Sequence, residues 1–295
     1  MSKFASALAA LLVLSAPVAA QAAIDAKLAP DSVTLTDNGR TVLVYRTRTN
    51  DPAEPGRLNY VHPLYAPDGT LLTEDRPADH LHQRGLFWSW HQVRLGDEVV
   101  ADGWFMKGLT FFVRGTKFQG QPDGSGVLTV DVDWIVNSKP ELIYVAREST
   151  KVTVRPATPA GQRIEFDTTI TARAPGLSLG GSDDVKGYGG FSMRLVQPDR
   201  LSFASRGEAV TPAVEAVPAG PAMGFAWPVA NAYPAWAVGL ACKAQGQPIT
   251  RWILRRELSM QNCVFPGRAP YAIPIDRPLR LESTVVIQPR ESAAR

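Results

Sequence analysis

The feature that most constrains the fold is a two-residue alternation of apolar and polar side chains that recurs along the chain. In Leu128–Trp134 the even positions are apolar and the odd positions are polar, which is typical of a strand with one buried face. The same alternation occurs in Val152–Arg155, Ile164–Asp167 and Leu279–Glu282. Further strand-like runs are Thr41–Thr47, Leu109–Thr116, Leu142–Val145, Phe191–Val196, Leu201–Ala204, Ala235–Ala241 and Ile249–Leu254.

Turn-forming residues separate these runs, as in Asp37-Asn38-Gly39, Pro67-Asp68-Gly69, Pro122-Asp123-Gly124 and Ala174-Pro175-Gly176. Glycine and proline number 24 each among 295 residues, which disfavours a helical bundle. Many half-apolar strands predict an all-β fold, a large antiparallel two-sheet β-sandwich, with a barrel as the second choice. The Ala-, Pro- and Gly-rich stretch 207–228 is expected to form a long surface loop or a lid.

The first 22 residues have the organisation of a secretory signal peptide. A basic Met1-Ser2-Lys3 start precedes the apolar run Phe4–Ala20, and Ala20-Gln21-Ala22 fits the small-x-small cleavage rule. No other stretch reaches the ~18 apolar residues that span a bilayer, so we expect no integral membrane segment. The sequence therefore predicts a periplasmic or secreted protein with one β-sandwich domain, residues 23–295.

Charge and cysteine content narrow the class further. With 31 basic and 28 acidic residues and no basic patch, the chain does not have the composition of a nucleic-acid-binding protein. Cys242 and Cys263 are the only cysteines. In an exported protein they form either one disulfide between neighbouring strands or two buried thiols, and both interpretations stay open. Nothing in the sequence sets an oligomeric state.

All four histidines, His62, His80, His82 and His91, fall within 30 residues of one another. Histidine is the readiest general acid or base near neutral pH and a common metal ligand. His80 and His82 are two residues apart, so on a strand they would share one face. We predict that these two act in acid/base catalysis with help from His62, and that His91 is structural.

The residues around this cluster suit a sugar pocket. Asp79 is predicted to bind substrate and could also orient a histidine. Arg84 could bind a carbonyl, hydroxyl or carboxylate group as a further catalytic residue. Trp88 and Trp90 are predicted to stack on a sugar ring, because the apolar C–H faces of sugars pack on aromatic rings. The competing interpretation places Trp88, like Trp134, in the core.

A second segment, Asp183–Arg194, contains Lys186, Tyr188 and Arg194, which could reach the same pocket and bind substrate. Its glycines allow a tight bend before a strand, and a β-bulge with solvated charges is the equal alternative. The chain has no G-x-x-x-x-G-K-[ST] phosphate loop.

Tyr60–Gly69 and Asp79–Trp88 resemble the bacterial PmoA-like family. Its hallmark is Asp-His-Pro-His-His-Arg-Gly/Ser-Leu-Phe/Trp-Trp after Tyr-x-x-Pro-x-x-x-Pro-x-Gly. Gly189–Arg194 is similar to a later Gly-Gly-Phe/Leu-x-x-Arg strand of that family, and Pro234-Ala235-Trp236 to its Pro-x-Trp. The sequence departs from the hallmark at Leu81 and Gln83, where the family has proline and histidine.

The resemblance implies a galactose-mutarotase-like β-sandwich, or supersandwich, and carbohydrate chemistry, since members accompany sugar oxidoreductases and keto-sugar-processing enzymes. The family label of methane oxygenase does not suit a chain without membrane-spanning helices. Gln83 joins the substrate-binding residues and weakens a three-histidine metal site. No cofactor is firmly implied, and a divalent metal on His80 and His82 is the less favoured alternative.

These observations predict an exported carbohydrate-active enzyme that acts on a sugar, keto-sugar or glycoside by histidine acid/base chemistry. Lyase, glycoside-cleaving and epimerase-like reactions all use such chemistry. The alternatives are a sugar-binding module without turnover and a periplasmic copper- or zinc-binding protein.

Overall fold

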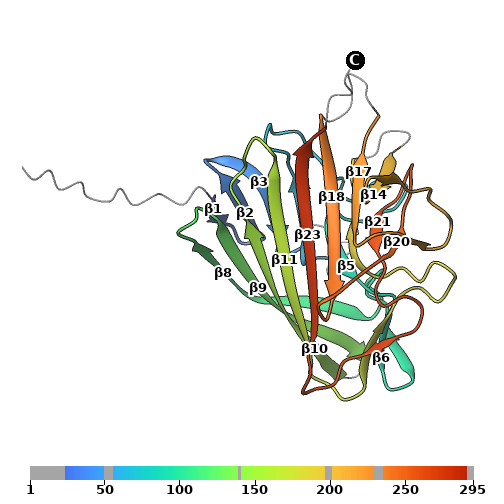
Figure 1. Ribbon diagram of the computed structural model, residues 1–295. Helices are drawn as coiled ribbons and strands as arrows, with labels where there is room; N and C mark the ends of the chain where they lie inside the picture. Colours follow the sequence, from blue (N-terminus) through green and yellow to red (C-terminus); the bar gives the residue numbers. More distant parts are fainter. Residues whose placement is uncertain (1–23, 50–55, 139–140, 197–200, 229–234, 291–295) are drawn as a thin grey trace, which may run out of the picture.

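The computed structural model describes residues 24–49, 56–138, 141–196, 201–228 and 235–290, and the expected signal peptide, residues 1–22, lies outside them. No α-helix occurs in these ranges, and none of their residues forms a helix suited to crossing a membrane. The strands (Figure 1) are β1 (Ile24–Leu28), β2 (Ser32–Asp37), β3 (Arg40–Arg46), β4 (Tyr60–Leu64), β5 (Leu86–Ser89), β6 (Gln92–Leu95), β7 (Glu98–Ala101), β8 (Leu109–Gly120), β9 (Gly126–Ser138), β10 (Glu141–Val154), β11 (Gln162–Ala172), β12 (Leu177–Gly180), β13 (Gly190–Met193), β14 (Ser202–Ser205), β15 (Glu208–Ala209), β16 (Val217–Pro218), β17 (Ala222–Ala226), β18 (Trp236–Ala244), β19 (Gln247–Pro248), β20 (Arg251–Ile253), β21 (Gln261–Cys263), β22 (Tyr271–Ala272) and β23 (Leu279–Pro289).

Two large antiparallel sheets form the body of the protein. One has the order β1-β2-β3-β4-β5-β13-β21-β20-β16, and the other has the order β15-β14-β17-β18-β23-β11-β10-β9-β8 with β19 beside β18. Apolar side chains from both sheets meet in one large continuous core. The predicted all-β antiparallel sandwich is therefore confirmed, and both sheets are open rather than closed into a barrel. The sequence did not reveal a small third sheet, β22-β12-β6-β7.

The long strands follow the alternation that the sequence contains. Along β9, the side chains of Leu128, Val130, Val132 and Trp134 are buried in the core, as the pattern predicts. Asp133 is the exception, because it is also buried, and Arg114 and Arg147 cover its carboxylate at N···O distances of 3.1 and 3.0 Å. The two positive guanidinium groups thus offset the cost of removing this carboxylate from water.

One carboxylate lies fully inside the core. Glu148 Oε1 accepts hydrogen bonds from Asn59, Trp88 and Thr150, and Oε2 accepts one from Trp134. Burial raises the pKa of Glu148, and the four hydrogen bonds only partly oppose that effect. The indole nitrogen of Trp88 is used here, so Trp88 belongs to the core and does not stack on a sugar.

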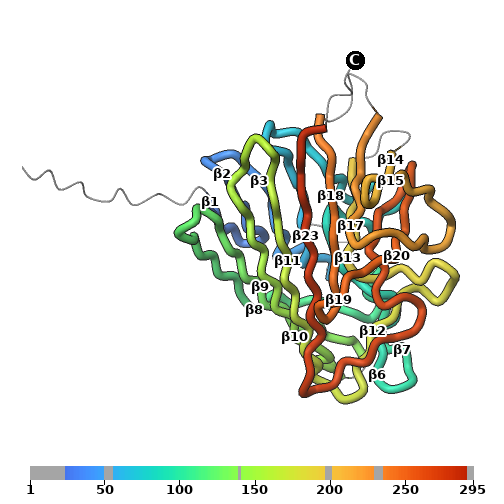
Figure 2. The backbone as a smooth tube through the Cα atoms, in the orientation of Figure 1, coloured from blue at the N-terminus to red at the C-terminus, as the bar shows by residue number. Residues whose placement is uncertain are grey.

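The stretch 207–228 is not a single loop or lid. It contains β15, β16 and β17, and it crosses from the ten-stranded sheet to the nine-stranded sheet and back (Figure 2). By contrast, the predicted turn at Asn38 and Gly39 joins β2 to β3, with φ angles of 50° and 80°. Successive positive φ angles are what a tight hairpin between twisted strands requires.

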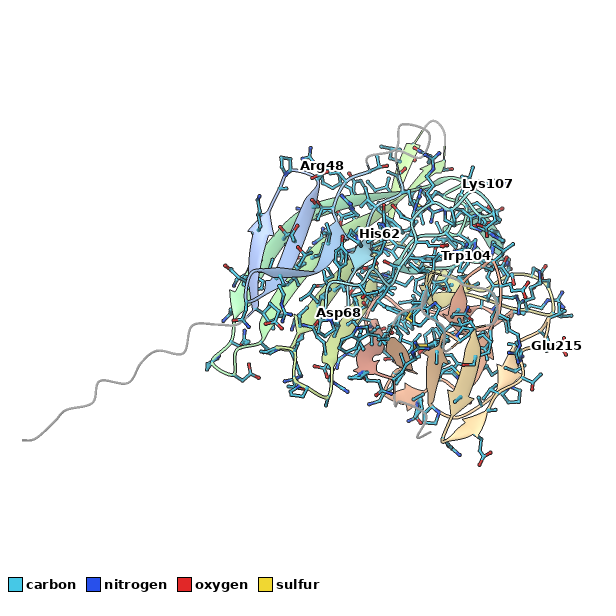
Figure 3. The ribbon with its side chains drawn as sticks, turned by 90° about the horizontal axis from the view of Figure 1, so that it is seen from above. Arg48, His62, Asp68, Trp104, Lys107 and Glu215 are labelled. Atoms are coloured by element: carbon cyan, nitrogen blue, oxygen red, sulfur yellow. A yellow bond between two sulfur atoms is a disulfide. The ribbon has the colours of Figure 1, made fainter. Side chains whose placement is uncertain are left out.

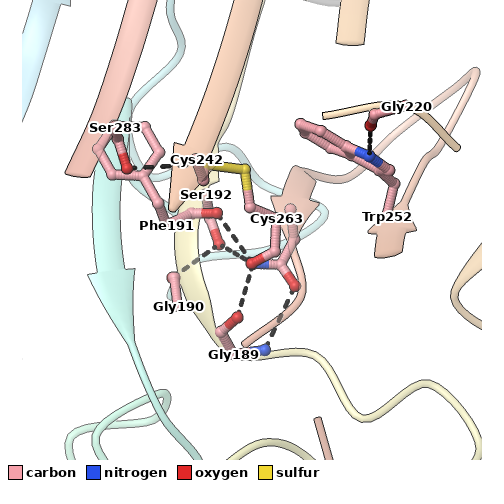
Figure 4. Close-up of a disulfide and its surroundings, with 10 residues drawn as sticks. Gly189, Gly190, Phe191, Ser192, Gly220, Cys242, Trp252, Cys263 and Ser283 are labelled. Carbon is pink, nitrogen blue, oxygen red and sulfur yellow. Dashed lines mark hydrogen bonds between the residues drawn. A yellow bond between two sulfur atoms is a disulfide. The ribbon is translucent and has the colours of Figure 1, made fainter. Parts of the chain in front are cut away.

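Cys242 and Cys263 form a disulfide (Figure 4). Cys242 lies in β18 of the ten-stranded sheet, and Cys263 lies in β21 of the nine-stranded sheet. Of the two interpretations of these cysteines, the disulfide is therefore the one that the structure has. The bond links the two large sheets at the strand that follows the 254–260 loop.

Candidate functional site

A cavity of about 360 Å³ brings together side chains from four distant segments of the chain. The segments are 80–83, 104–105, 186–188 and 253–260. Five of the predicted site residues line the cavity, namely His80, His82, Gln83, Lys186 and Tyr188. The 80–83 and 186–188 segments therefore line the same cavity.

Two tight turns, rather than a strand, position the histidines. The amide of His80 donates to the carbonyl of Pro77, and the amide of Gln83 donates to the carbonyl of His80. Each bond joins residue i to residue i+3, as in a β-turn. Proline pre-sets the backbone for such a turn. The expectation that His80 and His82 alternate along a strand is wrong, yet the turns still hold their rings 5.6 Å apart between centroids.

His80 is oriented by its sequence neighbour. Its Nδ1 lies 2.7 Å from Oδ2 of Asp79, and its side chain is 35% exposed at the cavity. A carboxylate on Nδ1 fixes the ring orientation and leaves Nε2 to exchange a proton with a bound molecule. Burial acts to raise the pKa of Asp79, but the hydrogen bond from His80 and the charge of Arg194 lower it overall. Asp79 is therefore ionised at neutral pH.

Arg194 fixes the positions of Asp79 and Gln83 by hydrogen bonds. The guanidinium is buried and donates through Nε to Glu74 (2.8 Å), through Nη1 to Gln83 (3.0 Å) and through Nη2 to Asp79 (3.0 Å). Gln83 in turn donates to the hydroxyl of Ser259 at 3.0 Å. Arg194 was predicted to bind substrate, but it does not line the cavity. It is a positioning residue for Asp79 and Gln83.

Aromatic rings form one wall of the cavity. The Tyr188 ring lies 4.7 Å from that of Trp104 between centroids, and the His82 ring lies 4.8 Å from that of Phe105. Burial, together with the charges of Asp184 and Asp102, raises the pKa of the Tyr188 phenol. The phenol therefore stays protonated and can donate a hydrogen bond to a bound hydroxyl group.

His91 supports this wall without lining the cavity. Its ring stacks on Trp104 at 5.3 Å with an interplanar angle of 18°, and it meets the edge of Tyr188 at 4.9 Å. Nδ1 of His91 lies 2.9 Å from the carboxylate of Asp102, which also accepts the backbone amide of Phe105. The placement agrees with the structural interpretation of His91.

The loop between β20 and β21 completes the cavity, and the sequence pattern did not point to it. Arg255 lines the cavity with Leu258, Ser259 and Met260. Leu258 and Ser259 have φ angles of 34° and 139°, a region that side chains other than glycine rarely adopt. Strain of this kind clusters at functional sites. No motif marks Arg255, because main-chain carbonyls of another segment determine its place.

Arg84 and His62 do not reach the cavity. Arg84 is buried, with Nη1 3.6 Å from Asp75 and its guanidinium 5.7 Å from the centre of the Tyr60 ring. His62, in β4, lies 3.0 Å through Nδ1 from the hydroxyl of Thr73, and burial lowers its pKa. Figure 3 labels His62 and the cavity residue Trp104. The catalytic roles predicted for Arg84 and His62 have no basis in this geometry.

Trp90 is also placed differently from the prediction. Its side chain is buried, it packs on Trp134 at 5.8 Å, and its indole donates to the carbonyl of Phe265. The aromatic rings at the cavity are instead those of Trp104, Phe105 and Tyr188.

The cavity offers a metal ion few donors. Across the described ranges, no three His, Cys, Asp or Glu side chains come together as a ligand set. His80 and His82 supply two imidazoles, and Asp79 already binds both Arg194 and His80. The donor set therefore favours proton transfer over metal binding.

Comparison with known families gives one match. A family model with the description "Family of unknown function (DUF6807)" covers residues 32–295. The chain belongs to this family. The match includes every segment that lines the cavity of this DUF6807 protein. No curated protein matches the chain.

Proposed function

We propose that this DUF6807 protein is an exported carbohydrate-active enzyme in which His80 exchanges a proton with a sugar held in the cavity. The observation that carries the proposal is the Asp79–His80 pair at a cavity with an aromatic wall. The exposed ring of Phe105 offers a face for the C–H side of a sugar ring, and Tyr188 offers a donor for a hydroxyl group.

The pairing of His80 with His82 suits reactions that need an acid and a base on one substrate. Their rings lie edge to face, 5.6 Å apart between centroids, and both line the cavity, so a molecule bound beside them could lose a proton to one and receive a proton from the other. Elimination, epimerisation and glycoside cleavage all use such a pair. The PmoA-like resemblance of residues 60–88 adds the expectation of sugar or keto-sugar substrates.

The disulfide supports a periplasmic or secreted location. Disulfides persist in oxidising compartments and are rare in the cytosol. Cys242 and Cys263 are bonded, which agrees with the signal-peptide pattern of residues 1–22.

The test is turnover of glycosides and keto-glycosides by the purified protein and by matched variants. We expect His80→Gln to lower kcat by about 100-fold or more, the usual contribution of a general acid or base. Asp79→Asn should lower kcat and leave KM nearly unchanged, because Asp79 orients His80 and does not line the cavity. Asp183→Asn, the same change at an exposed carboxylate, is the control.

The aromatic wall also suits a sugar-binding module, which would need no proton transfer. Tight binding in titrations with no turnover of any substrate would favour the module. Equal turnover by wild type and His80→Gln would refute the catalytic proposal.

A further inference from the structure

The charged groups on the cavity wall are all of one sign. Lys186 and Arg255 line the cavity beside His80 and His82. Among the described residues that line it, none is aspartate or glutamate. A concave surface with charge of one sign concentrates ligands of the opposite sign.

Arg255 is held in place without using up its charge. Nη1 donates to the carbonyls of Ala213 and Leu254 at 2.7 and 2.8 Å, and Nη2 donates to the carbonyl of Val214 at 2.8 Å. All three acceptors are neutral main-chain oxygens. Within the described ranges no carboxylate pairs with the Arg255 guanidinium, and the hydrogen bonds of that group are the three named here.

Two N–H groups of the Arg255 guanidinium are not used by the carbonyls and are placed to bind a ligand. A guanidinium has five N–H groups, and the carbonyls use three of them. The N–H of Nε and one N–H of Nη2 remain. Donors on neighbouring nitrogens of a guanidinium match the two oxygens of a carboxylate. Burial lowers the pKa of Arg255, which indicates that its charge lacks a full counter-charge in the protein.

Lys186 adds a second cation that remains available. Its Nζ lies 3.6 Å from Asp184, and the two side chains are 37% and 45% exposed. An exposed ion pair of this length is weak. Oδ1 of Asp184 is already bound by the hydroxyl of Ser182 and by the amides of Lys186 and Gly187. Asp184 therefore shapes the turn that presents Lys186 more than it neutralises the cavity.

We propose that the ligand of this cavity is an acidic sugar, one with a carboxylate on its ring, and that Arg255 binds the carboxylate. This inference rests on the proposed carbohydrate function and narrows its substrate class. The exposed ring of Phe105 can face the apolar side of the sugar ring, and Lys186 adds a second positive charge at the cavity. The planar fork of Arg255 can bind both oxygens of a carboxylate at once.

The first experiment is calorimetric titration of the whole protein with matched sugars. Galacturonate and glucuronate are compared with galactose, with glucose and with the two neutral methyl esters of the acids. We expect the acids to bind about 10- to 100-fold more tightly, the range for hydrogen bonds to a charged group. The preference should shrink as salt is added, because screening weakens exposed charge pairs.

Variants then assign the effect to the cavity. Arg255→Gln and Lys186→Gln should each weaken binding of the acids and leave binding of the neutral sugars nearly unchanged. Lys186 is exposed, so its variant tests the charge even if Arg255→Gln disturbs the loop. Arg163→Gln, on the outer face of β11, removes one charge far from the cavity and should change nothing.

The outcomes separate this inference from the proposed function. Equal affinity for acids and methyl esters would overturn the acidic-sugar inference and leave the carbohydrate proposal standing. Binding of sulfated or phosphorylated sugars without binding of uronates would overturn the carboxylate assignment. If no saccharide of the panel binds, both proposals fail.

Discussion

Glu148 allows the sharpest test of how the core is held together. Its Oε1 accepts three hydrogen bonds, and its Oε2 accepts one from Trp134. In Glu148→Gln the amide oxygen can keep the three-donor position, which turns the NH₂ group toward the indole N–H. Two buried donors then face each other. A buried donor without an acceptor costs about 1–3 kcal/mol, so we expect a loss of about 2 kcal/mol in the free energy of unfolding at acid pH.

The direction in which this stability difference changes with pH can also be predicted. Burial raises the pKa of Glu148 in the folded protein above its ordinary value of 4.5. The wild type therefore loses stability as the pH rises from about 4.5 through the folded pKa, because the unfolded chain releases that proton more easily. Glutamine does not titrate. The difference in unfolding free energy between wild type and Glu148→Gln, here called the gap, should therefore narrow as the pH rises.

Urea unfolding followed by tryptophan fluorescence between about pH 4 and pH 8 measures the gap. Glu141→Gln, an exposed position on the same strand β10, is the matched control and should match wild type. A gap that widens with pH would refute the reasoning, since it would mean that the four donors outweigh burial. The absence of a gap at every pH would show that Trp134 finds another acceptor.

Two further predictions concern the supports of the site. Arg194→Met should lower the free energy of unfolding by about 3 kcal/mol at neutral pH, the lower end for a broken buried ion pair, because its partners Glu74 and Asp79 are partly exposed. In urea unfolding this loss should shrink as the pH falls through the lowered pKa of Asp79, and a loss that is constant with pH would contradict the ion-pair explanation. Removing the disulfide with Cys242→Ala and Cys263→Ala should cost about 3 kcal/mol, the value for a loop of this length. Thermal unfolding of the wild type should respond to reductant and that of the double variant should not, so an equal response would count against the bond.

The sequence predicted the long strands well because their pattern records burial directly. In β9 and β11 each apolar residue of the alternation packs into the core. The small third sheet could not be found in this way, because β6, β7, β12 and β22 have only two to four residues each. A strand of that length shows no alternation, and only tertiary pairing defines it.

The site was predicted in part, for reasons that differ from residue to residue. His80 and His82 lie together because of turns that begin at Pro77, not because of strand periodicity. Trp88 and Trp90 looked like sugar platforms, but buried acceptors satisfy both indoles. Arg255 could not be found, since carbonyls some 40 residues away hold it. Local patterns do not report partners that only the folded chain supplies.

The order of strands has a consequence for how the cavity comes into being. β5, β13 and β21 are neighbours in one sheet, although they begin at residues 86, 190 and 261. Each one adjoins a segment that lines the cavity. The last of these segments ends at Met260, so a chain synthesised from its N-terminus has no complete pocket until that residue has emerged. Contacts of such long sequence separation form late and slowly. The cavity should thus be completed late in folding, when β5, β13 and β21 pair in their sheet.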